Sequence, residues 1–327
     1  MVKIKSINKT LAMICTASAI GCGGETDYSV DEIDPPQKQT EIFYGEEIEH
    51  GEIPAIGGLI IGSGLCSATL IHEQIVLTAG HCISQPFYTR FIYGVSDLKE
   101  VINEQKMEFV HDAAATARYP GYNDGPAYWN DVGLVILKKP IKDAATLPIM
   151  SPELYEERLS VGNNVVIAGY GKDENDNSGV LKKANVPIIR RDDLEITIGS
   201  GFPGMPDACR GDSGGGIYVS HENADYVTGI ASRLISHDGE AICGRSTIYT
   251  LPGCYQPWIR EVCEENLGEE SCSGFAEEVD CDLPNDKLVL EPQGEGCSYS
   301  SGGNGKENNA LLLLAPLLLY GLRKRKE

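Results

Sequence analysis

Three short motifs in this 327-residue chain carry side chains that can work together as a nucleophile and its proton-transfer partners. His81 lies in residues 77–82 (Leu-Thr-Ala-Gly-His-Cys), Asp131 in 130–134 (Asn-Asp-Val-Gly-Leu) and Ser213 in 211–215 (Gly-Asp-Ser-Gly-Gly). A serine hydroxyl attacks a carbonyl carbon only when a base takes its proton and a carboxylate orients that base. The three residue types therefore predict acyl-transfer chemistry of the kind that hydrolyses peptide bonds.

Each motif also has an ordinary structural explanation when it is taken alone. A histidine after an apolar run is often a strand-end residue, an aspartate after asparagine is often in a turn, and a glycine-rich segment is often only a loop. The order histidine, aspartate, serine, with matching flanks at all three positions, makes a chance coincidence improbable.

The order and the flanking residues resemble the trypsin/chymotrypsin family over about residues 42–265, roughly two thirds of the chain. The resemblance implies an all-β fold of two packed six-stranded antiparallel barrels with a short C-terminal helix. Short apolar runs separated by Gly, Asn, Asp and Pro across 42–266 independently favour an all-β barrel or sandwich. Only residues 255–265 predict a helix.

The roles of the site residues are carried over from the family. His81 is then the general acid and base, Asp131 orients its imidazole, and Ser213 attacks the scissile carbonyl. The backbone N–H groups of Gly211 and Ser213 would form the oxyanion hole, and glycine at 211 suits a turn with unusual backbone angles. The resemblance thus implies a serine endopeptidase.

Asp207, six residues before Ser213, corresponds to the floor of the family's specificity pocket. A carboxylate there selects Arg or Lys, because a basic side chain pairs with it and an apolar one leaves it unpaired. By the same resemblance Ser232 and Thr247 line the pocket. Thr247 stands where trypsin has glycine, and Leu234 also departs from the trypsin pattern, so both could narrow the pocket.

The chain has eleven cysteines, and residues 1–22 predict an export signal. In an exported chain such cysteines indicate disulfides. The resemblance implies Cys66–Cys82 beside the base and Cys209–Cys243 beside the pocket. The sequence alone leaves the later cysteines open, with one option being Cys254–Cys263 and Cys272–Cys281.

Residues 42–45 (Ile-Phe-Tyr-Gly) resemble the N-terminus that proteolysis frees in this family, and polar, acidic residues 23–41 predict a pro-segment. In the family the new ammonium pairs with the acid before the nucleophile, which implies the pair Ile42 and Asp212. The residue before Ile42 is Glu41 rather than Arg or Lys. We therefore expect a separate activating protease to cut the zymogen.

Both ends of the chain carry targeting patterns. Residues 1–22 predict a signal peptide, with lipidation of Cys22 as an alternative ending. Residues 267–300 predict an acidic, cysteine-containing stalk. Residues 301–327 hold a leucine-rich run and a basic end, and resemble C-terminal sorting tails of secreted bacterial proteins. A buried helix is the alternative. The tail predicts a sorting protease as partner and a place in the cell envelope, at the cell surface or in the medium.

The net charge of −21 argues against nucleic-acid binding, which favours a basic face. The sequence holds no Cys-x-x-Cys or His-Glu-x-x-His run, so we expect no metal and no cofactor. We expect the protein to be a monomer whose partners are protein or peptide substrates. Two other function classes stay open, a protease-shaped binding module and a surface adhesin.

Overall fold

The structure is a computed structural model that describes residues 42–283, apart from 84–87, 124, 126–128, 238–239 and 282. The predicted signal peptide with Cys22, the pro-segment and the sorting tail lie outside the described residues, as does the stalk beyond residue 283. Within the described part of the chain, no helix is long and apolar enough to cross a membrane.

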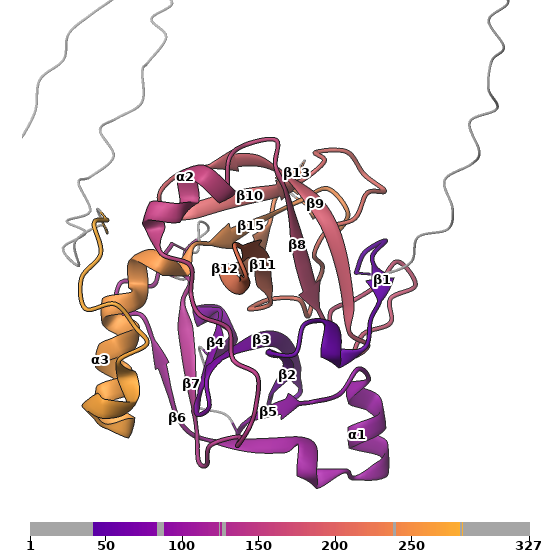
Figure 1. The fold of residues 1–327 in the computed structure, drawn as a ribbon. Coiled ribbons are helices and arrows are strands. Elements are labelled where there is room, and N and C mark those ends of the chain that lie inside the picture. The colour runs from indigo at the N-terminus through magenta and orange to yellow at the C-terminus, as the bar shows by residue number, and fades with distance from the viewer. Residues whose placement is uncertain are drawn as a thin grey trace, which may run out of the picture. The chain divides into compact units, whose positions relative to one another are not determined.

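The first half of the described chain forms a closed antiparallel barrel with the strand order β2-β3-β4-β7-β6-β5 (Figure 1). Every residue of β4 and β7 is buried, so these paired strands read as continuous apolar runs rather than as alternating ones. The bounds of the six strands are β2 Ile56–Ile61, β3 Gly64–His72, β4 Ile75–Thr78, β5 Thr89–Tyr93, β6 Val110–Arg118 and β7 Gly133–Leu137.

The second half forms another six-stranded antiparallel barrel, in which pairing of β8 with both β11 and β9 closes the circle β8-β9-β10-β15-β12-β11. The short strand β1 (Glu46–Glu47) adds to β9 on the outside. The bounds of the barrel strands are β8 Asn164–Gly169, β9 Lys182–Arg191, β10 Glu195–Gly199, β11 Gly216–His221, β12 Ala224–Leu234 and β15 Ser246–Thr250. The predicted pair of barrels is confirmed.

Helices connect the strands and finish the domain. The predicted C-terminal helix is α3, Gln256–Leu267, and α1 (Leu98–Glu104) and α2 (Tyr155–Arg158) lie in connections that the sequence did not predict as helical. The remaining elements are β13 Ser236–His237, β14 Glu240–Ala241 and the 3₁₀ turns η1 His50–Glu52, η2 Gly80–Ile83, η3 Met107–Phe109, η4 Pro152–Leu154, η5 Pro252–Tyr255 and η6 Glu269–Cys272.

Helix α3 follows the second barrel in sequence but packs against the first, beside β6 and β7 (Figure 1). Its buried Ile259 and Val262 belong to the same apolar cluster as the core of the first barrel. Tyr119, at the end of β6, meets the rings of Tyr255 and Trp258 edge-on at centroid distances of 4.9 and 5.4 Å. The helix therefore fastens the two halves of the chain together.

Four disulfides cross-link the described residues. Two are the bridges that the resemblance implied, and the other two differ from the option named above. The later cysteines pair as Cys254–Cys281 and Cys263–Cys272. Cys263 lies nine positions after Cys254 in a mostly helical segment, and a helical rise puts the two roughly 13 Å apart, too far for a bridge.

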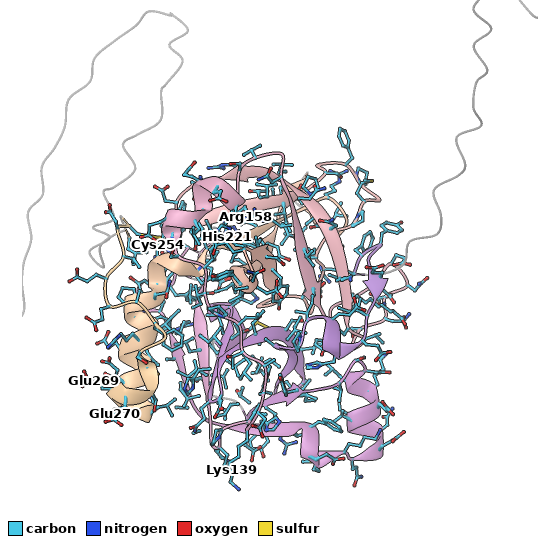
Figure 2. All side chains as sticks on the ribbon, in the orientation of Figure 1. Lys139, Arg158, His221, Cys254, Glu269 and Glu270 are labelled. Atoms are coloured by element: carbon cyan, nitrogen blue, oxygen red, sulfur yellow. A yellow bond between two sulfur atoms is a disulfide. The ribbon has the colours of Figure 1, made fainter. Side chains whose placement is uncertain are left out.

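The same two bridges tie residues 268–281 to the preceding part of the chain, so the first part of the predicted stalk is fixed to the domain. Figure 2 shows Cys254 near the start of α3 and Glu269 and Glu270 at its far end.

Replacing Cys254 and Cys281 by alanine should lower the free energy of unfolding by about 3.5 kcal/mol, because the bridge closes the longer loop. The Cys263→Ala/Cys272→Ala pair closes a shorter loop and should cost about 2.5 kcal/mol on the same basis. Denaturant unfolding measures both values. Non-reducing peptide mapping that finds Cys254 joined to Cys263 would contradict the pairing itself.

Candidate active site

The pairing of β4 with β7 brings His81 and Asp131 together. His81 follows β4 in the turn η2, Asp131 precedes β7, and Thr78 pairs with Gly133 in the ladder between the two strands. The fully buried Asp131 accepts two hydrogen bonds from His81, one from Nδ1 to Oδ2 and one from the backbone N–H to Oδ1, each 2.8 Å. An acidic acceptor at Nδ1 assigns the proton to that nitrogen and leaves Nε2 with its lone pair.

Ser232 on β12 adds a further donor to the same carboxylate. Its hydroxyl lies 2.6 Å from Asp131 Oδ2. Since β12 belongs to the second barrel and Asp131 to the first, the Asp131 carboxylate is held from both sides. The sequence predicts Ser232 as a pocket residue, and the structure adds a hydrogen bond from its side chain to the carboxylate that binds His81.

The loop that carries Ser213 is seated on the first barrel through Ser67 of β3. The Ser67 backbone N–H donates to the Ser213 carbonyl (2.8 Å), and the Ser67 hydroxyl donates to the Gly211 carbonyl (3.1 Å). Gly211 has φ of 100°, and a Cβ there would lie 2.9 Å from Gly171 Cα. Both facts require glycine at 211, as the oxyanion-hole assignment expects.

Gly214 brings the nucleophile loop beside the histidine. A Cβ at Gly214, which has φ of 79°, would lie 2.1 Å from Thr78 Oγ1, three residues before His81. The Cys82 sulfur lies 3.8 Å from His81 Nε2 and 3.7 Å from the Ser213 carbonyl oxygen. The structure thus gathers the three residues of the predicted constellation at the junction of the two barrels.

The trypsin family model matches residues 42–259, about two thirds of the chain, and this span contains all of the residues just described. The chain belongs to the trypsin family. It is accordingly a serine peptidase, and its substrates are proteins or peptides.

In this trypsin-family chain Asp207 is fully buried. Its Oδ1 accepts a 2.8 Å hydrogen bond from the Thr247 hydroxyl, and its Oδ2 accepts one of 3.2 Å from the Arg245 backbone N–H. Burial raises the pKa of Asp207 to about 7. Leu234 lies directly opposite Thr247 across β12 and β15. The two residues that depart from the trypsin pattern, Thr247 and Leu234, therefore form a cross-strand pair next to Asp207.

The predicted activation pair is also buried. Ile42 is 2% exposed within the second barrel's core, and the neighbouring Phe43 carbonyl accepts from the Asp207 N–H at 3.2 Å. Asp212 accepts from the backbone N–H groups of Gly171 (2.8 Å) and Cys209 (2.9 Å). Burial raises the pKa of Asp212 to about 6.

One group of side chains near the site resembles a metal-binding cluster by proximity. The donor atoms of Cys66, His81 and Cys82 lie within 4.8 Å of one another. The two sulfurs are bonded to each other, so neither is a thiolate that could ligate a metal. Among the described residues, this group offers no metal site.

Two contacts of the site were not predicted from the sequence, those of the Ser67 and Ser232 hydroxyls. Ser67 had no motif to mark it, and Ser232 was predicted only as a pocket residue. Lys182, a buried residue that interacts electrostatically with Asp212, did leave a signal in the sequence. It stands at an inward position of an alternating strand, followed by Ala184 and Val186. A lysine in such a position is unusual enough to single out.

Replacing Ser232 by alanine should lower kcat by roughly 3- to 30-fold, since a hydrogen bond to a charged group is worth ~1.5–3 kcal/mol and only part of it is lost in the transition state. Steady-state kinetics measures the effect, and thermal melting should show that the protein stays folded. Ser220→Ala, at an exposed serine of β11, is the matched control. An unchanged kcat in Ser232→Ala would show that the contact to Asp131 does not matter for catalysis.

Proposed function

We propose that this chain is a serine endopeptidase that works through an acyl-enzyme on Ser213, cleaves after Arg or Lys, and is made as a zymogen activated by cleavage before Ile42. The observation that carries the proposal is the buried Asp131 carboxylate, which accepts both from the imidazole Nδ1 and from the backbone of His81. That arrangement fixes the ring and its tautomer beside the seated Ser213 loop.

In the proposed reaction, His81 Nε2 takes the Ser213 hydroxyl proton while the serine oxygen bonds to the scissile carbonyl carbon. Asp131 stabilises the imidazolium that forms. The backbone N–H groups of Gly211 and Ser213 donate to the developing oxyanion. His81 then returns the proton to the leaving amine, and a water molecule attacks the acyl-enzyme by the reverse sequence of proton transfers.

Selection of Arg or Lys is supported by the buried Asp207, whose neighbours in the structure are neutral donors. A substrate guanidinium or ammonium would supply the positive partner that a buried carboxylate lacks. A second candidate, cleavage after small uncharged residues, is favoured by the Thr247 hydroxyl on Asp207 and by Leu234 opposite it. The two candidates differ in whether a long basic side chain displaces Thr247 from the acid.

Activation by cleavage is supported by the burial of Ile42 in the second barrel and of Asp212 beneath the nucleophile loop. An ammonium freed at Ile42 would need a buried carboxylate as its partner. Because Glu41 precedes it, an enzyme that selects basic residues should cut this bond poorly. The proposal therefore includes a separate activating protease that accepts glutamate.

Ser213→Ala and His81→Ala should each lower kcat by about 10⁴-fold or more, because the members of such a unit depend on one another. Turnover of a peptide substrate measures the loss, and circular dichroism should show an unchanged fold. A fluorophosphonate probe should label the wild-type protein on Ser213. Failure of the activated protein to react with the probe would favour a protease-shaped binding module.

The preference for Arg over a neutral residue should depend on pH through Asp207. Its pKa is raised to about 7, so the acid is ionised above that pH and loses its charge as the pH falls through it. The ratio of kcat/KM for paired Arg and Ala substrates should therefore fall about tenfold from pH 8 to pH 6. The ratio cancels any pH dependence that the two substrates share.

Asp207→Ser is the control for this dependence and should give a low ratio that no longer changes with pH. A wild-type ratio below one, which Thr247→Gly reverses, would instead establish the second candidate and reject selection of basic residues.

A further inference from the structure

Lys182 is a buried cation that the proposed mechanism does not use. It begins β9 at an inward position, in register with Ala184, Val186 and Ile188, which are core residues of the second barrel. Its side chain is only 4% exposed. A lysine is almost never so buried unless an acid pairs with it, because desolvation of the ammonium is costly.

The strand pairing places Lys182 beside Asp212. Lys182 lies directly opposite Gly169 in the ladder between β8 and β9, and directly opposite residues project from the same face of a sheet. A Cβ on Gly169 would lie 2.1 Å from Asp212 Oδ1, so the Asp212 carboxylate occupies the space over this glycine. The Lys182 ammonium consequently lowers the pKa of Asp212, against the opposite effect of burial.

Asp212 supports the loop that carries Ser213 through hydrogen bonds to neighbouring backbone groups. Its two oxygens accept from Gly171 and Cys209, and Gly171 in turn packs against the turn at Gly211. An uncompensated charge on a carboxylate that is 1% exposed would favour its release to solvent, and the loop would move with it. In the uncut chain the nitrogen of Ile42 is a neutral amide, so it carries no charge to compensate Asp212.

We propose that Lys182 is a positioning residue whose ammonium holds Asp212 in place before cleavage, so that the uncut chain already has peptidase activity. Freeing the Ile42 ammonium then adds a second positive partner and raises the activity further. The inference rests on the proposed function, since it concerns the assembly of the same site.

Lys182 also binds Asp173, with 3.2 Å between Nζ and Oδ2. Asp173 does not depend on this contact, because its Oδ1 accepts from the backbone N–H groups of Asn175 and Asn177, each at 2.8 Å. A purely structural role in the loop after β8 would make Lys182 equally important before and after cleavage. A role through Asp212 instead makes Lys182 important mainly before cleavage.

The test compares uncut and cut forms of the full-length protein. Glu41→Gly protects the bond before Ile42, and mass spectrometry verifies the intact chain. For the cut form, residues 37–41 are replaced by four aspartates and a lysine, and enteropeptidase then frees Ile42, as N-terminal sequencing confirms. Each form is made as wild type, Lys182→Met and Lys182→Arg. Lys183→Met, at the partly exposed neighbour that pairs with Glu46 and Glu52, is the matched control.

We expect the uncut wild-type protein to retain at least ~1% of the kcat of the cut form. Lys182→Met should lower the kcat of the uncut form at least ~10-fold and that of the cut form less than ~3-fold. Lys182→Arg should recover part of the uncut activity because it keeps the charge, and Lys183→Met should change neither form. The rate of fluorophosphonate labelling should follow the same pattern.

An inactive uncut wild type beside an active cut form would overturn this inference and leave the proposed function standing. Equal losses in both forms of Lys182→Met would overturn it as well. Inactivity of both wild-type forms would reject the proposed function itself. If Lys182→Met does not fold, the Asp173→Asn/Lys182→Met double variant, which leaves one fewer carboxylate unpaired, takes its place under the same criteria.

Discussion

The site depends on the carboxylate of Asp131, a full charge placed where two barrels meet and where water does not reach it. Three donors satisfy this charge, two from His81 and one from Ser232 on the other barrel. A buried carboxylate tolerates the loss of such donors poorly, because water cannot replace them. The relative placement of the barrels and the orientation of the imidazole are therefore stabilised by the same hydrogen bonds.

Three acidic side chains of this domain are buried, and each is stabilised by a different set of donors. Asp131 has hydrogen-bond donors from two barrels, Asp207 has a hydroxyl and a backbone N–H, and Asp212 has two backbone N–H groups with a lysine nearby. The raised pKa values of Asp207 and Asp212 show that neutral donors compensate burial only in part. Both acids therefore lack full compensation for burial, which supports the proposal of a substrate cation as partner for Asp207 and a cation of the chain as partner for Asp212.

The fold could be predicted because short local motifs resemble those of a known family. Gly211 and Gly214 occupy backbone conformations and close approaches that exclude side chains, so the nucleophile motif is readable without any tertiary information. Helix α1 was missed because it buries only Leu98 and Val101, too few residues to create a periodic pattern.

Contacts between distant segments could not be read from the sequence. The hydroxyl of Ser232 is 101 residues from the carboxylate it supports, and no spacing rule connects the two. The pairing of Cys254 with Cys281 depends on the length of α3, which decides which sulfurs can meet. The bond from Thr247 to Asp207 depends on the register of β15 against its neighbours, and that register decides how much of the pocket floor is covered.

The bridge between Cys254 and Cys281 also determines how the domain would respond to mechanical tension. A pull applied to the chain beyond residue 281 passes through the sulfur–sulfur bond directly to Cys254, in the turn η5 just before α3. The helix and the turn after it lie inside the closed covalent loop and carry none of the load. The packing of α3 on the first barrel is therefore shielded from forces transmitted along the C-terminal segment.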